Sequence, residues 1–175
     1  MTSPIFIPDL FSTIVKKVAT AIGYPVYFDY GHYNEVTRNL TQKDRSISQR
    51  DKKYPLIWLV MDYIEEFGEL DYEYCRLPDL QFIIAVPTSA AKTTSDRITD
   101  NFKTILYPIY VEFKNQIQQS GYFNNADPLK HEKIDRPYWG GQDTLGNGQA
   151  NLFNDFIDAI QLRRVVLNVN EICNE

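Results

Sequence analysis

The feature that most constrains this fold is an uninterrupted apolar run, Leu56–Met61, within the segment Tyr54–Ile64. A strand with one solvated face alternates apolar and polar residues, whereas a strand covered on both faces does not. We therefore expect Tyr54–Ile64 to form a strand that is buried on both faces. A second apolar segment, Leu80–Val86, follows it, and the short link between them predicts an antiparallel hairpin. Pro78 has no N–H for the ladder, so it predicts a bulge or an edge at that point.

Two segments show the periodicity of amphipathic helices. In Ile7–Ile22, large apolar residues recur every four positions and form one stripe. In Ser95–Gln119 they recur every three or four positions, and Ser95 is suited to cap the N-terminus. Pro108 lies inside this second helix, where it removes a backbone hydrogen bond and clashes one turn back. We therefore expect a kink near Thr104–Pro108.

The remaining strands complete an α+β arrangement in a single domain, residues 1–175. Tyr24–Tyr30 and Ala159–Val169 have the composition of strands, and a change of phase at Arg163-Arg164 predicts a bulge in the second. The predicted fold is a small antiparallel sheet packed against the N-terminal helix and the long Pro-kinked helix. The sheet would consist of the apolar hairpin and the first and last strands.

Two long loops are expected, at residues 32–53 and 121–150. Both exceed the usual length of connections in compact domains, and such loops commonly carry a function or order on a partner. The second is rich in glycine and turn-forming residues and also contains Tyr138 and Trp139. Tyrosine and tryptophan are enriched at protein interfaces, so this loop predicts a surface that packs on another chain.

The formal net charge of −5 over 175 residues argues against broad nucleic-acid binding, because that binding needs a basic surface. The charge is unevenly distributed. Basic interface candidates lie in the first loop: Arg38, Lys43, Arg45, Arg50, Lys52 and Lys53. Acidic interface candidates lie around the hairpin turn: Glu65, Glu66 and Glu69. Two interpretations stay open: two solvated segments of opposite charge, or a basic loop that meets an acidic edge of a neighbouring subunit.

The residues predict no catalytic, cofactor or metal site. His32 and His131 lie in the expected loops without a second ligand at metal-site spacing. One loose motif matches the PD and ExK pattern of Mg²⁺-dependent nucleases: Pro78-Asp79, then Glu112-Phe113-Lys114. That chemistry needs the Glu and Lys on a strand beside the Asp, whereas here they lie in an expected helix. A nuclease is therefore the alternative and not the favoured hypothesis.

The cysteines and the hydropathy indicate the expected environment. Cys75 and Cys173 form no CxxC motif, and the N-terminal residues do not resemble a signal peptide. No apolar stretch approaches the roughly 20 residues that span a bilayer. We expect a soluble protein in a reducing compartment.

Three segments carry a resemblance to a known family: Tyr54–Leu59, Thr93–Arg97 and Asn154–Ile160. Together with the order of elements, they resemble the tail-terminator and head–tail joining proteins of tailed bacteriophages, most closely the neck ring proteins of crAss-like phages. The resemblance covers residues 6 to 169. The long segments at 32–53 and 121–148 depart from the compact terminator pattern.

The resemblance implies a virion structural protein of the neck or tail that is assembled in the host cytoplasm. Its partners would be copies of itself in a six- or twelve-fold ring, and the portal, an adjacent neck ring or tail proteins. DNA would pass through the lumen without specific binding. A head-to-tail contact closes into such a ring when its rotation closes. A monomeric adaptor protein is a further alternative.

Overall fold

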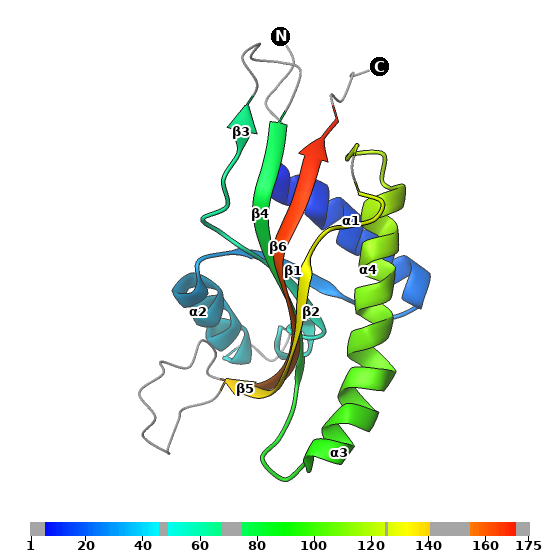
Figure 1. The fold of residues 1–175 in the computed structure, drawn as a ribbon. Helices are drawn as coiled ribbons and strands as arrows, with labels where there is room; N and C mark the ends of the chain where they lie inside the picture. Colours follow the sequence, from blue (N-terminus) through cyan, green and yellow to red (C-terminus); the bar gives the residue numbers. More distant parts are fainter. Residues whose placement is uncertain (1–5, 46–48, 68–74, 125, 141–154, 171–175) are drawn as a thin grey trace.

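A mixed six-stranded sheet with helices on both faces forms the centre of the protein in the computed structural model (Figure 1). The structure describes residues 6–45, 49–67, 75–124, 126–140 and 155–170. The helical elements are α1 (Ile7–Ile22), α2 (Tyr33–Asp44), the 3-10 turn η1 (Arg50–Lys52), α3 (Thr94–Asp96), the π-helical η2 (Arg97–Leu106) and α4 (Tyr107–Gln119). The strands are β1 (Tyr27–Gly31), β2 (Leu56–Val60), β3 (Glu66–Phe67), β4 (Cys75–Pro87), β5 (Glu132–Gly140) and β6 (Phe156–Val169).

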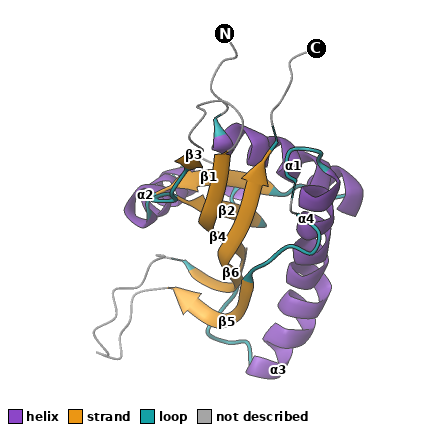
Figure 2. Cartoon of the chain, turned by 45° about the horizontal axis from the view of Figure 1, so that its top comes forward, coloured by secondary structure: helices purple, strands orange, loops and turns teal. Residues whose placement is uncertain are grey.

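The strands follow the order β1-β2-β4-β6-β5, and β3 pairs with β4 beyond the end of β2 (Figure 2). The α+β class and the antiparallel pairing of β2 with β4 are confirmed. The expectation of a purely antiparallel sheet is wrong, because β1 runs parallel to β2. Parallel neighbours need a crossover connection, and α2 supplies it.

The strand β2 is buried on both faces, as its apolar run predicts. Its residues Ile57 and Leu59 face the larger hydrophobic cluster, which α1, η2 and α4 cover. Its residues Leu56, Trp58 and Val60 face a smaller cluster on the opposite side, which α2 covers. We call these sides the two-helix face and the α2 face.

Aromatic packing holds α1 and α4 on the two-helix face. Phe11 of α1 packs edge-to-face on Phe82 of β4, with ring centroids 4.7 Å apart. Phe82 also packs on Phe113 of α4, at 5.1 Å. All three side chains are fully buried. The helix α1 ends as expected at Gly23, whose φ of +80° places it in the left-handed region that glycine adopts without strain.

The long helix is continuous through α3, η2 and α4, but it begins and winds differently from expectation (Figure 1). Thr93 and not Ser95 is the N-cap, and it forms a reciprocal capping box with Asp96. Before Pro108 the chain is π-helical, and the Tyr107 N–H donates to the Phe102 carbonyl five residues back. The Thr104 hydroxyl likewise donates to the Thr99 carbonyl, at 2.7 Å. The proline, expected to kink the helix near Thr104–Pro108, is thus preceded by a wider helical turn and lies in the first turn of α4.

Two consecutive bulges flank the Leu80–Val165 pair in the β4–β6 ladder, one in each strand, and both were expected. One extra residue enters β4 between Leu77 and Leu80, at Pro78-Asp79. One extra residue enters β6 between Leu162 and Val165, where Arg164 has a φ of +52°. Each bulge keeps the apolar residues on either side of it on the two-helix face.

The expected loop at 32–53 is wrong for most of its length, because it contains α2 and η1. Val36 and Leu40 are the buried apolar residues of α2, and they pack on the α2 face of the sheet. Tyr33, at the start of α2, packs edge-to-face on Trp58 with ring centroids 4.7 Å apart. The Trp58 indole N–H donates to the Gly31 carbonyl at 3.0 Å. Two apolar residues and an aromatic contact therefore place this otherwise polar helix.

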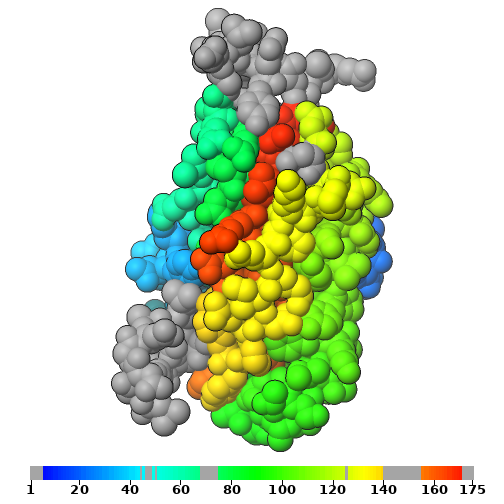
Figure 3. Space-filling model, viewed as in Figure 1, coloured from blue at the N-terminus to red at the C-terminus, as the bar shows by residue number. Residues whose placement is uncertain are grey.

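The expected loop at 121–150 is also wrong in part, because it contains the edge strand β5. This strand pairs antiparallel with β6, with a bulge between Arg136 and Trp139. Tyr138, within that bulge, has a φ of +53°. Figure 3 shows β5 as a yellow band on the surface, beside the green long helix. Residues 141–150 lie outside the described residues.

Candidate functional site

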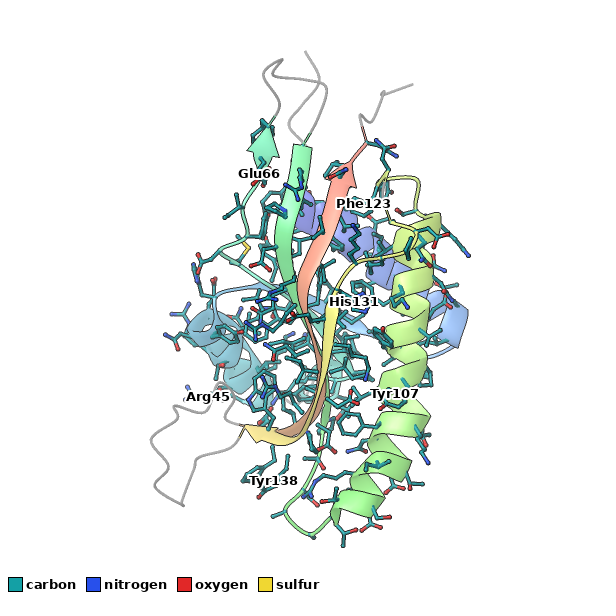
Figure 4. The ribbon with its side chains drawn as sticks, viewed as in Figure 1. Arg45, Glu66, Tyr107, Phe123, His131 and Tyr138 are labelled. Carbon is teal, nitrogen blue, oxygen red and sulfur yellow. The ribbon has the colours of Figure 1, made fainter. Side chains whose placement is uncertain are left out.

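The residues expected to contact other subunits lie in three separate places (Figure 4). Arg45 lies at the end of α2, Glu66 lies on β3 at the opposite end of the molecule, and Tyr138 lies at the lower end of β5. The structure therefore does not gather the candidates into one site. It presents three surfaces, each of which is described below.

The first surface is the exposed side of α2 and η1, which we call the basic α2 surface: Arg38, Lys43, Arg45 and Lys52. Arg38, Arg45 and Lys52 are exposed, whereas Lys43 is half-buried. Lys43 interacts with the Asp29 carboxyl, whose pKa burial raises and the lysine charge partly lowers again. Arg50 begins η1. The expected basic segment is thus arranged along one helix and the 3-10 turn that follows it.

Lys53 is a candidate that this surface does not include. Its side chain is 5 % exposed, and its ammonium lies 2.6 Å from the Asp155 carboxylate. The Tyr54 hydroxyl donates to the same carboxylate oxygen at 2.9 Å. These contacts join the end of the α2 crossover to the start of β6. The expectation that Lys53 contacts a neighbour is corrected accordingly, because its charge is neutralised within the subunit.

The second surface lies around β3. Glu65 and Glu66 are exposed, and Glu66 forms an ion pair with Arg76 at 3.0 Å across the β3–β4 ladder. Partial burial raises the pKa of Glu65, and none of the described residues forms an ion pair with it. Glu69 lies outside the described residues. The acidic candidates thus include one carboxylate that the described part of the subunit leaves unpaired.

The third surface is an exposed aromatic pair at the end of β5 and β6, which we call the aromatic end: Tyr138 and Phe156. The two rings stack with centroids 4.9 Å apart and planes 5° apart. The Arg97 guanidinium lies over the Tyr138 ring, 4.5 Å from its centroid. Both rings keep more than a third of their surface exposed. This is a layered arrangement of a cation and two rings, open to solvent on its outer side.

A buried polar network beneath the aromatic end fixes its geometry. The Asp158 carboxylate is fully buried, and it accepts hydrogen bonds from the Asn101 amide at 2.6 Å and from the Tyr138 N–H at 2.8 Å. Arg97 lies 3.7 Å from the same carboxylate and donates to the Ser89 carbonyl at 2.7 Å. A buried carboxylate needs such donors and a counter-charge. The network holds Tyr138 in its left-handed backbone conformation.

Trp139, the other aromatic candidate, lies on the α2 face of the sheet. It is half-buried and packs against the smaller hydrophobic cluster. The Arg136 guanidinium lies over its ring at 5.6 Å and donates to the buried Gln161 side chain at 3.0 and 3.1 Å. Because of the bulge at Tyr138, the Tyr138 side chain is exposed at the aromatic end, whereas the adjacent Trp139 side chain packs on the α2 face.

Sequence reasoning missed the buried polar residues that support the aromatic end: Arg97, Asn101 and Asp158. Asp158 did carry a signal, because it is a carboxylate inside an otherwise apolar strand. A buried charge of this kind predicts a partner. The partners themselves lie about 60 residues earlier in the chain, so the pairing could not be predicted.

The residues of the nuclease motif lie on different elements. Asp79 is exposed in the β4 bulge, and Glu112 is on α4, where it accepts a hydrogen bond from Gln116 at 2.6 Å. The Lys114 ammonium lies over the Tyr110 ring, 5.3 Å from its centroid. In the part of the chain that the structure describes, no group of three or more His, Cys, Asp or Glu side chains could hold a metal ion.

The histidines occupy ordinary hydrogen-bonding positions. His131 accepts from or donates to the Tyr110 hydroxyl at 2.8 Å through Nε2, and its Nδ1 lies 2.8 Å from the Leu129 carbonyl. A carbonyl only accepts, so Nδ1 carries the proton and Nε2 accepts in the neutral ring. His32 lies 3.2 Å from the Asp62 carboxylate at the surface.

No protein-family model matches the chain, and no curated protein matches its sequence. Within the described residues, no helix is both long enough and apolar enough to cross a membrane.

Proposed function

We propose that this chain is a structural protein of a bacteriophage virion, which closes with copies of itself into a ring in the head–tail connector. DNA would pass through the lumen of this ring, and the portal, an adjacent neck ring or tail proteins would dock on it. The proposal starts from the resemblance in element order and local sequence. The described structure adds surfaces suited to contacts with other chains.

The observation that carries the proposal is the aromatic end. A stacked pair of exposed rings is typical of an interaction site, and here a buried ionic network holds Tyr138 in a strained backbone conformation that presents it. Aromatic side chains that are already ordered lose little conformational entropy when they meet a partner. A rigid aromatic pair is therefore suited to be the anchor of an interface, and we assign it to the neighbouring ring or the portal.

The overall acidity supports the proposed role toward DNA. A net charge of −5 repels the phosphate backbone, and so favours passage over retention. The proposal accordingly makes the chain a non-enzymatic component without a cofactor, located in the neck or tail of the particle.

The experiment is a copy-number measurement on purified phage particles whose genome encodes this chain. Quantitative mass spectrometry should find six or twelve copies per particle, and a labelled antibody should mark the neck or tail in electron micrographs. Purified particles that lack the chain would contradict the proposal.

A pair of variants tests the aromatic end itself. Tyr138→Ser combined with Phe156→Ser should leave particles without a correctly joined tail. Val111→Ser is the matched control, because Val111 is an exposed apolar residue on α4, away from the aromatic end. Normal tail joining in the double variant would refute the role given to these rings.

The nuclease alternative has its own measurement. Mg²⁺-dependent cleavage of DNA by the purified chain, abolished by Asp79→Asn and by Glu112→Gln, would replace the structural proposal with an enzymatic one. The adaptor alternative predicts a chain that sediments as a monomer and is absent from the particle.

A further inference from the structure

Exposed apolar side chains also lie at β3, where Ile64 is 58 % and Phe67 is 63 % exposed. Phe6 (48 %) and Tyr30 (42 %), at the start of α1 and on β1, form a separate exposed pair. Scattered exposed apolar residues are normal in soluble proteins, whereas a contiguous group marks an interaction site.

Ile64 and Phe67 lie three residues apart on one segment of the chain. The Phe6 and Tyr30 rings meet edge-to-face with centroids 5.8 Å apart. Tyr63, which precedes Ile64, and Cys75 both pack against the larger hydrophobic cluster. Cys75 in turn lies directly opposite Phe67 in the β3–β4 ladder. Figure 1 shows β3 beside the upper end of β4.

We call the segment that enters and forms β3 the β3 end: Tyr63, Ile64, Glu65, Glu66 and Phe67. Its charge is acidic, because its charged side chains, Glu65 and Glu66, are both exposed carboxylates. Arg76 is already paired with Glu66. Glu65 is exposed next to Tyr63 in the chain and has no ion-pair partner among the described residues. The β3 end thus combines apolar area with an unneutralised carboxylate, and a basic partner would complement it.

The basic α2 surface has the opposite character. Its exposed cations Arg38, Arg45 and Lys52 form no ion pair with any described residue. These cations cannot neutralise Glu65 within one subunit, because α2 and β3 lie apart along one side of the molecule (Figure 4). Two copies can bring the surfaces together. Such a contact joins different patches on the two copies, which is the arrangement that generates a ring when its rotation closes.

We propose that the β3 end of one copy docks on the basic α2 surface of the next, and that this is the repeating contact within the ring. The inference rests on the proposed function and deepens it by naming the two surfaces. Phe67 and Ile64 supply the buried apolar area. Glu65 and Glu66 face Arg38 and Arg45 of the neighbour. Lys53 takes no part, because Asp155 neutralises it within the subunit.

The test reverses the charge of each surface separately in the full-length chain. One variant carries Glu65→Lys and Glu66→Lys, and the other carries Arg38→Glu and Arg45→Glu. Each alone should weaken self-association at least about tenfold in sedimentation equilibrium, because like charges then face each other. An equimolar mixture of the two variants should associate again, because the reversed surface of each matches the reversed surface of the other. Circular dichroism of each variant checks that it is folded.

A second set of variants tests the apolar part. Ile64→Ser and Phe67→Ser should each weaken association several-fold. Val111→Ser should leave association unchanged, because Val111 is equally exposed (52 %) but lies on α4, outside the β3 end. Rising salt should weaken self-association of the wild type, because it screens the charges of the two surfaces. At high salt, Phe67→Ser should still associate several-fold more weakly than the wild type.

The outcomes separate this inference from the proposed function. If the wild type forms rings and the charge variants form them equally well alone, the contact is wrong while the ring protein stands. If the wild type stays monomeric up to about 1 mM, where even weak contacts form, the direct contact is also overturned. Failure of the proposed function is a different result: purified particles would lack the chain. Association only in the mixed pair of charge variants supports the inference.

Discussion

The two faces of the sheet are covered in different ways. On the two-helix face, α1 and the long helix bury most of the aromatic core, and a buried ionic network closes its lower end. On the α2 face, a single polar helix rests on Trp58 through Tyr33, Val36 and Leu40. The first face supplies most of the buried apolar area and therefore most of the stability. The second face carries the basic α2 surface on its outer side.

The comparison teaches that the basic α2 surface is separate from the part of the protein that supplies most of its stability. Arg38, Arg45 and Lys52 lie on the lightly covered face, whereas the buried pair of Arg97 and Asp158 lies on the heavily packed one. Each of the following changes tests that separation, beginning with the largest expected effect.

Phe82→Ala should destabilise the protein most, because Phe82 lies at the centre of the two-helix face between Phe11 and Phe113. Removing a buried phenyl ring leaves a cavity and typically costs about 3–5 kcal/mol. Urea denaturation followed by circular dichroism measures the loss in the free energy of unfolding. A loss smaller than that of Leu40→Ala would break the comparison between the faces.

Asp158→Asn should lower the free energy of unfolding by about 2–3 kcal/mol, because it removes a charged hydrogen-bond acceptor and leaves Arg97 without its counter-charge. Hydrogen exchange of the Tyr138 amide should quicken as well, since its acceptor is weakened. Asp100→Asn is the control: Asp100 pairs with Lys92 at the surface, and such a pair contributes less than about 1 kcal/mol. Unchanged exchange at Tyr138 would show that the network does not hold the aromatic end.

Leu40→Ala should cost about 2 kcal/mol, at the lower end for a buried leucine, because α2 has few other anchors. Its main effect should be local. Amides of α2 should exchange faster while those of β2 and β4 keep their protection. Equal loss of protection in α2 and in the central strands would mean that the α2 face is as integral to stability as the two-helix face.

Tyr63 gives the smallest effect, visible only in alkali. Burial, and then the Glu65 charge, raise the pKa of Tyr63 to about 12. Because the folded-state pKa lies above the ordinary value near 10, this residue's stabilising contribution is complete below about pH 10 and is lost as the pH rises toward about 12. Ultraviolet titration of the wild type against Tyr63→Phe isolates this phenol. A difference spectrum that titrates near pH 10 would show that the β3 end is more solvated than described.

Sequence reasoning succeeded where one element carries its own pattern. The stripe of α1 and the uniform burial of β2 follow from apolar spacing alone, and both bulges follow from a proline and a change of phase. It failed where stability comes from distant partners. Val36, Leu40 and the Tyr33 ring anchor α2, so this helix depends on packing against the sheet and not on a long apolar stripe of its own.

The edge strand β5 was predicted as a loop for a related reason. It contains Lys133, Asp135, Arg136 and Pro137, which are unfavourable in a central strand but suited to an exposed edge. Among the candidate contact residues, Lys53 was misassigned because its partner Asp155 lies 102 residues away in the chain. The exposure of Arg38, Arg45, Glu65 and Tyr138 could be predicted from their polarity or loop context. The network beneath Tyr138 could not.

The consecutive bulges of β4 and β6 have a consequence for how this chain can change in length. The two bulges compensate each other, so the register of the strands is the same before and after them. Cys75 pairs with Val169 on one side and Phe82 pairs with Leu162 on the other, as in a ladder without bulges. Deleting a residue from one strand alone would turn half of its side chains from the core into water. A deletion in both strands together would leave every partner in place. Insertions and deletions at these positions should therefore be inherited jointly among relatives, as compensating changes in two segments about 85 residues apart.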